Sequence, residues 1–310
     1  MKKDYFSLNP FLSHVQLKRP VDWSKEFGRK APLAVEIGFG IGEYLVRTAK
    51  KQPAENFLGI DNSWVSVRRT LRKIAHEDLT NVRLLLTDAQ MAFERLIKPR
   101  SLARVYSLFP CPWPKKKHMK YRLHSQDFLK VLNNRLVNNG ELQMVTDHRE
   151  YLDWVMEQSK ATGFQAAWKE IEPKFDTKYE RKWQSKGQSL FYELTLKKKK
   201  HLSVPLKEDV ALKVYRLKSF CPEHFHPEGE NGPRTIIFKG FLYDPKRQKA
   251  MVEVITSEEN VRQHFWAAIT LQKGQWHVYI SEGSSVIPTE AVKRALELIH
   301  EASVLSCESV

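Results

Sequence analysis

The sequence predicts an α/β protein with a doubly wound, Rossmann-like sheet, followed by a smaller C-terminal α+β domain. Three observations lead to this prediction. Short apolar runs alternate with amphipathic stretches of helical length, a pattern typical of a mainly parallel sheet covered on both faces. A glycine-rich loop separates the first apolar run from the next helix. Beyond residue 200, the pattern changes to strands joined by short polar turns.

The expected elements follow this pattern along the chain. Strands of the first sheet are expected at 33–37, 56–60, 82–87, 104–109 and 141–146, with a returning hairpin at 165–172 and 189–197. Strands of the second sheet are expected at 210–218, 234–243, 249–256, 264–272 and 276–281, before a helix that starts at 288–290.

These elements divide into three regions. Residues 1–30 are polar and irregular, and we interpret them as an arm that orders over the body or on RNA. Residues 31–200 form the main α/β domain. A lysine run at 197–200 and Pro205 mark its end, and residues 201–310 form a small α+β domain whose role the sequence does not indicate.

The charge of the chain is unevenly distributed. The formal net charge is +15, and residues 1–200 carry 38 Lys and Arg against 22 Asp and Glu, an excess of 16. Residues 201–310 carry 13 Lys and Arg against 14 Asp and Glu. An excess of this size on one domain indicates a polyanionic partner, and the clustering of cations at 115–122, 178–186 and 197–200 favours nucleic acid over a generally basic, soluble surface.

The cysteines and the hydropathy suggest a soluble, cytoplasmic protein without a metal. No stretch approaches 18 apolar residues, and the first residues do not resemble a signal peptide. Cys111, Cys221 and Cys307 are odd in number and scattered, so we do not expect a disulfide framework. The Cys221-x-x-His-x-His226 stretch offers only three ligands, too few for a convincing zinc site.

Acidic residues follow three of the predicted parallel strands. Asp61, Asp88 and Asp147 each stand where a strand ends. The carboxyl ends of parallel strands meet at one edge of an open α/β sheet, and ligands bind at that edge. We therefore expect the functional site there.

The glycine loop at this edge favours S-adenosylmethionine over a dinucleotide. Its spacing, Gly38-x-Gly40-x-Gly42, lacks the Gly-x-Gly-x-x-Gly pattern of pyrophosphate binding. Glu36 and Glu43 flank it, and carboxylates attract the cationic groups of S-adenosylmethionine but repel a pyrophosphate.

Two of the strand-end acids fit the same donor. The carboxylate of Asp61 can accept hydrogen bonds from two ribose hydroxyls, and that of Asp88 can accept from an adenine amino group. A dinucleotide, or a glycine turn without a ligand, remains an alternative at this point.

A proline-rich loop follows the strand that ends at Phe109. Alternate prolines make it rigid and non-helical, and it carries a single aromatic, Trp113, which could stack on a base or wedge the loop against the sheet. Five cations follow within eight residues: Lys115, Lys116, Lys117, Lys120 and Arg122. A rigid apolar loop beside dense positive charge suits an enzyme that positions one base of a polyanion.

Together these motifs resemble the bacterial tRNA (guanine-N7-)-methyltransferases. The likeness rests on the segments 36–43, 109–118, 146–147 and 177–180, and it covers roughly residues 30–197. It implies a class I methyltransferase fold for residues 31–200, S-adenosylmethionine as donor, and guanosine 46 of the tRNA variable loop as acceptor. It implies tRNA as partner. Independently of the resemblance, we expect no metal and no membrane, and a monomer or homodimer.

The resemblance also implies residue roles. Donor contacts would come from Glu36, Gly38, Gly40, Gly42, Asp61 and Asp88. Contacts to the base or its surroundings would come from Lys115, Asp147, Thr177 and Glu180. Phosphate contacts are expected from Lys116, Lys117, Lys120 and Arg122, and the catalytic positions would be Cys111 and Asp147.

One position departs from the family pattern. The family loop usually reads Phe-Pro-Asp-Pro-Trp, whereas this chain has Cys111 in place of the aspartate. The N7 atom of guanine has a lone pair and no proton, so its attack needs no general base. A carboxylate would still stabilise the cationic product. We expect a working enzyme, with a methyltransferase for another RNA, or an RNA-binding relative with weakened or lost catalysis, as alternatives.

Overall fold

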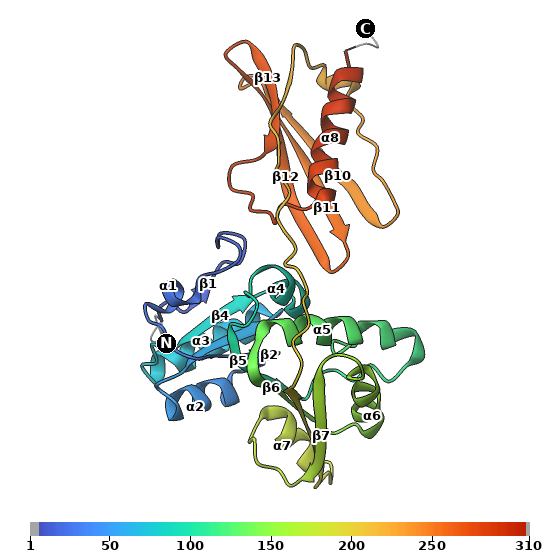
Figure 1. Ribbon diagram of the computed structural model, residues 1–310. Helices are drawn as coiled ribbons and strands as arrows, with labels where there is room; N and C mark the ends of the chain where they lie inside the picture. Colours follow the sequence, from blue (N-terminus) through green and yellow to red (C-terminus); the bar gives the residue numbers. More distant parts are fainter. Residues whose placement is uncertain (1–5, 308–310) are drawn as a thin grey trace. The chain divides into compact units, whose positions relative to one another are not determined.

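The computed structural model describes residues 6–307 and contains two compact units, residues 1–207 and 208–310. We describe each unit by itself. The first unit is a helix-covered eight-stranded sheet, and the second is a five-stranded sheet with one long helix (Figure 1).

The sheet of the first unit has the order β1-β4-β3-β2-β5-β6-β8-β7. Its strands are β1 (Phe11–Leu12), β2 (Leu33–Ile37), β3 (Asn56–Asp61), β4 (Val82–Leu86), β5 (Leu102–Leu108), β6 (Leu136–Thr146), β7 (Phe164–Ile171) and β8 (Phe191–Lys198). Strands β1 to β6 pair in parallel, while β8 pairs antiparallel with β6 and β7. The doubly wound prediction and the returning hairpin are both confirmed.

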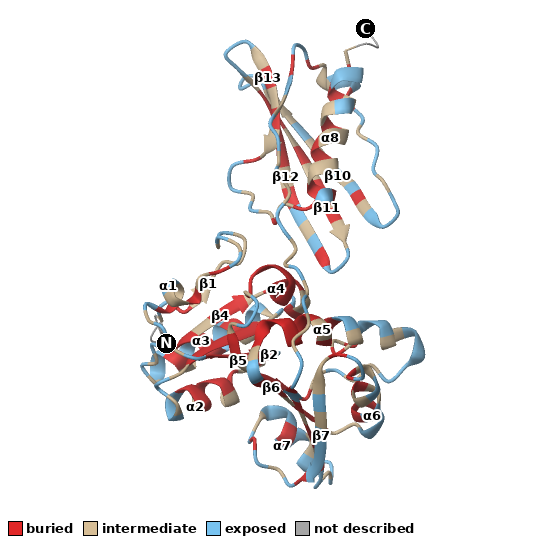
Figure 2. Ribbon diagram, in the orientation of Figure 1, coloured by how far each residue is buried: buried red, intermediate tan, exposed pale blue. Residues whose placement is uncertain are grey.

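Helices cover both faces of this sheet. They are α1 (Trp23–Phe27), α2 (Glu43–Lys51), α3 (Trp64–His76), α4 (Ala89–Arg95), α5 (Gln126–Arg135), α6 (Arg149–Gln158) and α7 (Lys178–Gln184), with a 3-10 helix, η1, at Lys116–Tyr121. Apolar residues of α1, α4, α5 and α6 share one core with the sheet, and those of α2 and α3 form a second core on the other face. The buried, red interior of Figure 2 follows the central strands between these layers.

The segment expected as an arm belongs to this unit from residue 6 onward. Strand β1 pairs with β4, and Val21, Trp23 and Phe27 are buried in the core. These apolar side chains dock α1 on the sheet because they would otherwise expose large apolar surfaces to water. Residues 1–5 lie outside the described part of the chain.

The chain beyond β8 also stays with the first unit. The amide of Asn134 donates to the carbonyl of Leu202 at 2.7 Å, and the buried guanidinium of Arg135 donates to the carbonyl of Val204 at 3.1 Å. The backbone N–H of Lys207 donates to the carbonyl of Glu94. The predicted boundary at residue 200 therefore precedes the observed one, because buried polar groups of α5 hold the following segment.

The second unit has the strand order β10-β11-β12-β13-β9. Its elements are β9 (Tyr215–Leu217), η2 (Pro222–His224), β10 (Arg234–Asp244), β11 (Lys249–Glu258), β12 (Val261–Gln272), β13 (Gln275–Ile280) and α8 (Glu290–Leu305). The pairs that the structure records in this sheet are antiparallel. Thr289 caps α8 by accepting from the N–H of Val292, as expected for a helix that starts after Pro288.

One disulfide is present, although the sequence did not predict a disulfide framework. Cys221 and Cys307 form a disulfide with a Cα–Cα distance of 5.3 Å, and it joins the η2 segment to the end of α8. The two cysteines are 86 residues apart in the sequence, and the antiparallel sheet with its returning helix brings them together. Cys111 is free and exposed.

Candidate active site

The glycine loop lies at the carboxyl end of β2, in the middle of the parallel strands. Gly38, Gly40 and Gly42 all have positive φ angles, of 69°, 56° and 74°, in the region where glycine is favoured. A Cβ at Gly42 would lie 2.4 Å from the side chain of Thr70 on α3, so a larger residue does not fit there. The loop thus turns sharply from β2 into α2 and leaves space above the strand ends.

Glu36 is a buried carboxyl group directly below this loop. It is 4% exposed, and its Oε2 atom is buried without a hydrogen-bond partner among the described residues. Burial, with a smaller contribution from Asp61, raises the pKa of Glu36 to about 8, while Arg47 opposes the shift. An unsatisfied buried carboxyl oxygen fits a cationic ligand group that completes the site.

The other two predicted donor contacts differ from each other. Asp61 ends β3, and its carboxylate accepts from the N–H of Gly40 at 3.0 Å and from that of Ser63 at 2.8 Å. It therefore fixes the glycine loop while lining the cleft. Asp88 is exposed, caps α4 by accepting from Met91 N–H at 3.1 Å, and does not line either cavity beside the loop.

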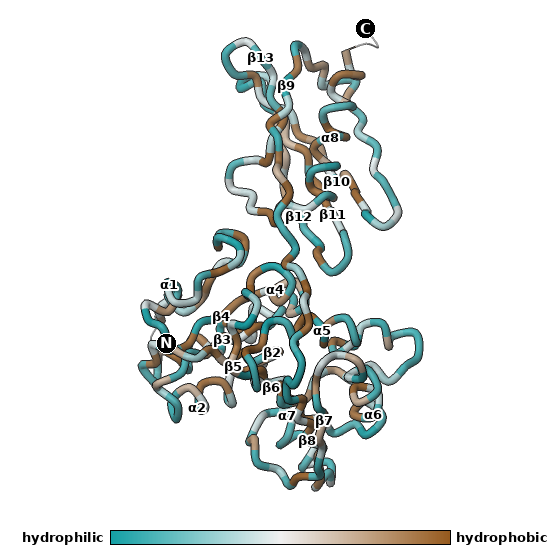
Figure 3. Tube along the Cα trace, viewed as in Figure 1, coloured by the Kyte–Doolittle hydropathy of each residue, from teal (hydrophilic) through white to brown (hydrophobic). Residues whose placement is uncertain are grey.

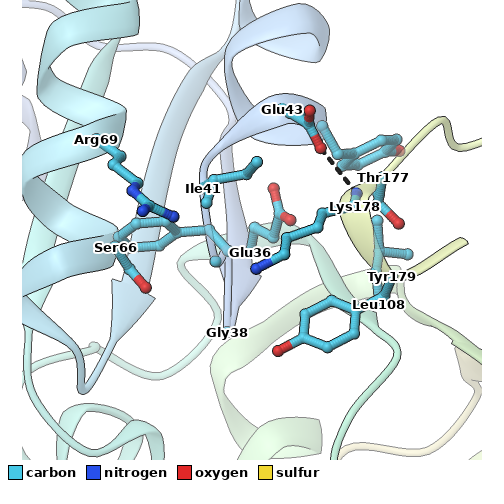
Figure 4. A pocket seen from close by; sticks show the side chains of 13 residues that line it. Glu36, Gly38, Ile41, Glu43, Ser66, Arg69, Leu108, Thr177, Lys178 and Tyr179 are labelled. Atoms are coloured by element: carbon cyan, nitrogen blue, oxygen red, sulfur yellow. Dashed lines mark hydrogen bonds between the residues drawn. The ribbon is translucent and has the colours of Figure 1, made fainter. Parts of the chain in front are cut away.

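Two cavities flank the glycine loop. The smaller, about 130 Å³, lies between Glu36, Glu43 and the start of α7, as Figure 4 shows. The larger, about 470 Å³, extends from the glycine loop past Asp61 to Cys111. Both are lined by Gly38, Gly40, Ser66, Leu108 and Tyr179. The arrangement connects the predicted donor loop to the predicted acceptor loop.

The proline-rich loop carries backbone strain at two positions. Phe109 and Trp113 have φ angles of 54° and 43°, which are unfavourable for bulky residues. The Phe109 N–H donates to the carbonyl of Val145 at 2.7 Å, and its ring packs edge-on against Phe191. Strain of this kind persists only where surrounding contacts enforce it, and it is common at functional sites. Between the two positions lies the exposed thiol of Cys111.

Arg122 does not lie on the surface as a phosphate contact, and this expectation is corrected. It is 7% exposed, and its guanidinium donates to the carbonyl of Pro112 at 2.8 Å and to that of Trp113 at 3.4 Å. The same group lies over the rings of Tyr151 and Trp154. Arg122 therefore braces the proline-rich loop from below.

The four lysines of this region remain available to solvent. Lys115, Lys116, Lys117 and Lys120 are all exposed on or next to η1. Trp113 is half-buried, packs against His118 and Tyr121 of the same turn, and also lines the larger cavity. Trp113 therefore both packs against η1 and lines the cleft.

The Thr177–Glu180 motif serves the α7 segment itself. Thr177 caps α7 by accepting from Glu180 N–H at 3.2 Å. Glu180 is 1% exposed, and its carboxylate accepts from the backbone N–H groups of Lys174, Phe175 and Asp176. The predicted base contact for Glu180 is therefore corrected: its oxygens organise the loop that carries Thr177 to the cavity.

Asp147 follows β6, two strands from the glycine loop. It is half-buried, and the following helix α6 is capped by His148, whose ring accepts from Tyr151 N–H at 3.3 Å. Asp147 does not line either cavity beside the glycine loop. The structure therefore does not bring it together with Cys111 within one cavity.

A connection between α2 and α7 was missed from the sequence. The carboxylate of Glu43 accepts from the N–H of Lys178 at 2.8 Å (Figure 4). It also pairs with the guanidinium of Arg181. Arg47 donates to the carbonyl of Phe175. The concentration of basic residues at 178–186 was the available signal, but it was attributed to RNA alone. Tyr121 and Tyr179 also border the cleft and were not singled out.

Neither a metal-ligand cluster nor a membrane-spanning helix is found within the described residues. Residues 6–307 contain no group of three His, Cys, Asp or Glu side chains placed to hold a metal ion. The same part of the chain has no helix that is long and apolar enough to cross a membrane.

A glycine loop after a central strand, a buried acid below it and an acid at the next strand end are typical of an α/β enzyme that binds a nucleoside-containing cofactor at its strand ends. The family model described as "Putative methyltransferase" matches residues 30–193. The chain belongs to the tRNA (guanine-N7-)-methyltransferase family.

Three relatives named tRNA (guanine-N(7)-)-methyltransferase illustrate this membership. One from Chlorobium phaeobacteroides is 44% identical and covers 55% of this chain and 83% of its own length. One from Thermotoga maritima is 32% identical, and the alignment covers 91% of this chain and 92% of the relative. One from Coprothermobacter proteolyticus is 39% identical, and the alignment covers 90% of this chain and 89% of the relative.

The last two relatives extend the likeness beyond the range predicted from the motifs. That range ended near residue 197, whereas these alignments cover 293 and 297 residues and thus include part of the second unit. The second unit is therefore not peculiar to this chain.

Proposed function

We propose that this enzyme transfers a methyl group from S-adenosylmethionine to N7 of guanosine 46 in the variable loop of tRNA. The observation that carries the proposal is the continuous cleft from the glycine loop and Asp61 to Cys111. A donor on the loop and a base at the strand end would meet in this space. The family membership supports the substrate class.

The residues at the donor end fit S-adenosylmethionine. The unsatisfied Oε2 of Glu36 suits its α-ammonium group, and Asp61 suits the ribose hydroxyls. The positive φ angles of Gly38 and Gly40 let the backbone approach a ligand closely. When bound, S-adenosylmethionine supplies an electrophilic methyl group on a sulfonium. Asp88 would need to share its carboxylate between its helix cap and the adenine.

At the acceptor end, the chain mainly has to orient the base. The N7 lone pair lies in the plane of guanine and carries no proton, so no general base is required. The rigid loop around Cys111, with Lys115 in the same segment, would position the base edge together with Thr177 at the start of α7. The thiol of Cys111 stabilises positive charge on the product ring less well than a carboxylate would. We propose that orientation by the rigid loop is the main catalytic contribution here.

The basic surface fits tRNA as the polyanion. Lys116, Lys117 and Lys120 are exposed beside the cleft and would contact phosphates. A tRNA substrate places the protein in the cytoplasm.

Methyl transfer to an unmodified tRNA transcript tests this function. Labelled S-adenosylmethionine is supplied, and the product nucleoside is identified by mass spectrometry. We expect 7-methylguanosine. A different methylated nucleoside, or transfer only to another RNA, would favour a methyltransferase for another RNA. Donor binding without any transfer would favour an RNA-binding relative without catalysis. The replacement of the usual aspartate by Cys111 motivates this second alternative.

A further inference from the structure

The five-stranded sheet of the second unit has one face packed on a helix and one face without such a cover. Successive residues of a strand point to opposite faces. On β11, Ala250, Val252 and Val254 are buried in the core shared with α8, so Met251 and Ile255 point to the other side. Figure 1 shows α8 along one side of this sheet. We call the other side the open sheet face.

The open sheet face carries aromatic and apolar side chains. Trp266 on β12 and Tyr279 on β13 alternate with core residues and are only half-buried. Tyr279 lies opposite the small Ala268, and Trp266 lies opposite Glu253. On β10, Leu242 is 63% exposed. An exposed sheet surface with two rings on neighbouring strands is typical of a binding face rather than of solvated surface.

Two unpaired cations lie on the open sheet face. Arg216 and Arg262 are exposed, point to this face by the strand register and have no ion-pair partner within residues 6–307. Glu253 is an acidic residue on the same face. By contrast, Arg294 on α8 is neutralised by Glu230 and by other glutamates of its own helix. The open sheet face thus carries two cations that are unpaired among the described residues, whereas the cation Arg294 on the helix side is paired.

We propose that the open sheet face binds unpaired bases of the tRNA substrate. Trp266 and Tyr279 would stack on bases, while Arg216 and Arg262 would contact the phosphates between them. Sheet faces that combine rings with cations bind single-stranded RNA in this way, because every base offers a π face and every linkage a negative charge. The two cations without partners favour RNA over a second protein surface. This proposal rests on the proposed function and assigns the second unit a role in substrate binding.

The test uses the full-length protein and a fluorescently labelled, unmodified tRNA transcript. We compare Arg262→Glu with the matched control Lys293→Glu, which reverses the same charge on α8. A second variant combines Trp266→Leu and Tyr279→Leu, so the face stays apolar but loses its rings. We expect Arg262→Glu and the leucine variant each to weaken tRNA binding about tenfold. The control should bind as the wild type does, and kcat at saturating tRNA should not change.

The outcomes separate this proposal from the proposed function. Unchanged tRNA affinity in both face variants, with methyl transfer by the wild type intact, overturns the open-face proposal alone. A change of oligomeric state with unchanged affinity also overturns it, because the face would then join two copies. Failure of the wild type to bind or methylate any tRNA contradicts the proposed function, and with it this extension. If the leucine variant does not fold, the comparison of tRNA affinity between Arg262→Glu and Lys293→Glu still tests the proposal.

Discussion

The guanidinium Nε of Arg122 lies 2.8 Å from the carbonyl oxygen of Pro112. This hydrogen bond crosses from the end of η1 to the middle of the proline-rich loop. The loop contains two bulky residues with positive φ, Phe109 and Trp113, and prolines that cannot donate hydrogen bonds. The side chain of Arg122 therefore replaces the backbone hydrogen bonds that would otherwise hold such a loop.

Arg122→Lys should lower kcat about tenfold or more while leaving donor affinity unchanged. Lysine can neither reach two carbonyls with a planar fork nor lie flat over Tyr151 and Trp154, and a charge-assisted hydrogen bond contributes about 1.5–3 kcal/mol. Steady-state kinetics with tRNA and a donor-binding titration measure both quantities. As the control, Lys120→Ala should raise KM for tRNA instead. If Arg122→Lys behaved like this control, the bracing role would be wrong.

Cys111→Asp should raise kcat on the order of tenfold, because a carboxylate stabilises the cationic product better than a thiol does. Cys111→Ser should stay near the wild-type rate, since it exchanges one neutral group for another. Single-turnover measurements at saturating tRNA isolate the chemical step. A rate that falls with aspartate would show that the site is built around the thiol.

Lys116→Ala and Lys117→Ala should each weaken tRNA binding and reduce its salt dependence. Each lost phosphate contact lowers the slope of log affinity against log salt by roughly 0.7–0.9, because fewer counterions are released. Affinities measured over a series of salt concentrations give this slope. Lys51→Ala, an exposed lysine at the end of α2, is the matched control. An unchanged slope in both variants would exclude these lysines from the interface.

Glu36 should make the stability of the donor-free protein depend on pH. Burial raises its pKa from the ordinary 4.5 to about 8, so the folded state favours the neutral form. Its stabilising contribution is full below about pH 4.5 and is lost as the pH rises through about 8. Thermal unfolding should therefore show that the stability of Glu36→Gln increases relative to that of the wild type as the pH rises. S-adenosylmethionine should remove this difference, since its ammonium pairs with the ionised carboxylate of Glu36. If the stability of the donor-free wild type and of Glu36→Gln changed in parallel with pH, the raised pKa of Glu36 would be contradicted.

The sequence predicted those parts of the site that follow from strand order. Glu36, the glycine loop and Asp61 lie where predicted, because parallel strands bring their carboxyl ends to one edge. Asp88 also follows a strand, but its oxygen caps α4. A strand-end position alone does not tell whether a carboxylate serves a ligand or the helix that follows.

The sequence did not predict which charged side chains are used inside the protein. Arg122 and Glu180 occur among surface-type residues, yet each is buried and bound to backbone groups of a neighbouring loop. Their roles depend on loops with positive φ angles, including Asp176, that no apolar periodicity reveals. The Cys221–Cys307 disulfide was missed for a related reason, since its contact depends on the fold of the whole second unit.

The most direct test of the central claim is the position of the methyl group. Wild-type enzyme and labelled S-adenosylmethionine are incubated with an unmodified tRNA transcript and with the same transcript carrying adenosine at position 46. Nuclease fragments are then sequenced by mass spectrometry. We predict 7-methylguanosine at position 46 of the first transcript and no transfer to the second. Equal labelling of both transcripts, or a methyl group at another position or atom, would contradict the assignment.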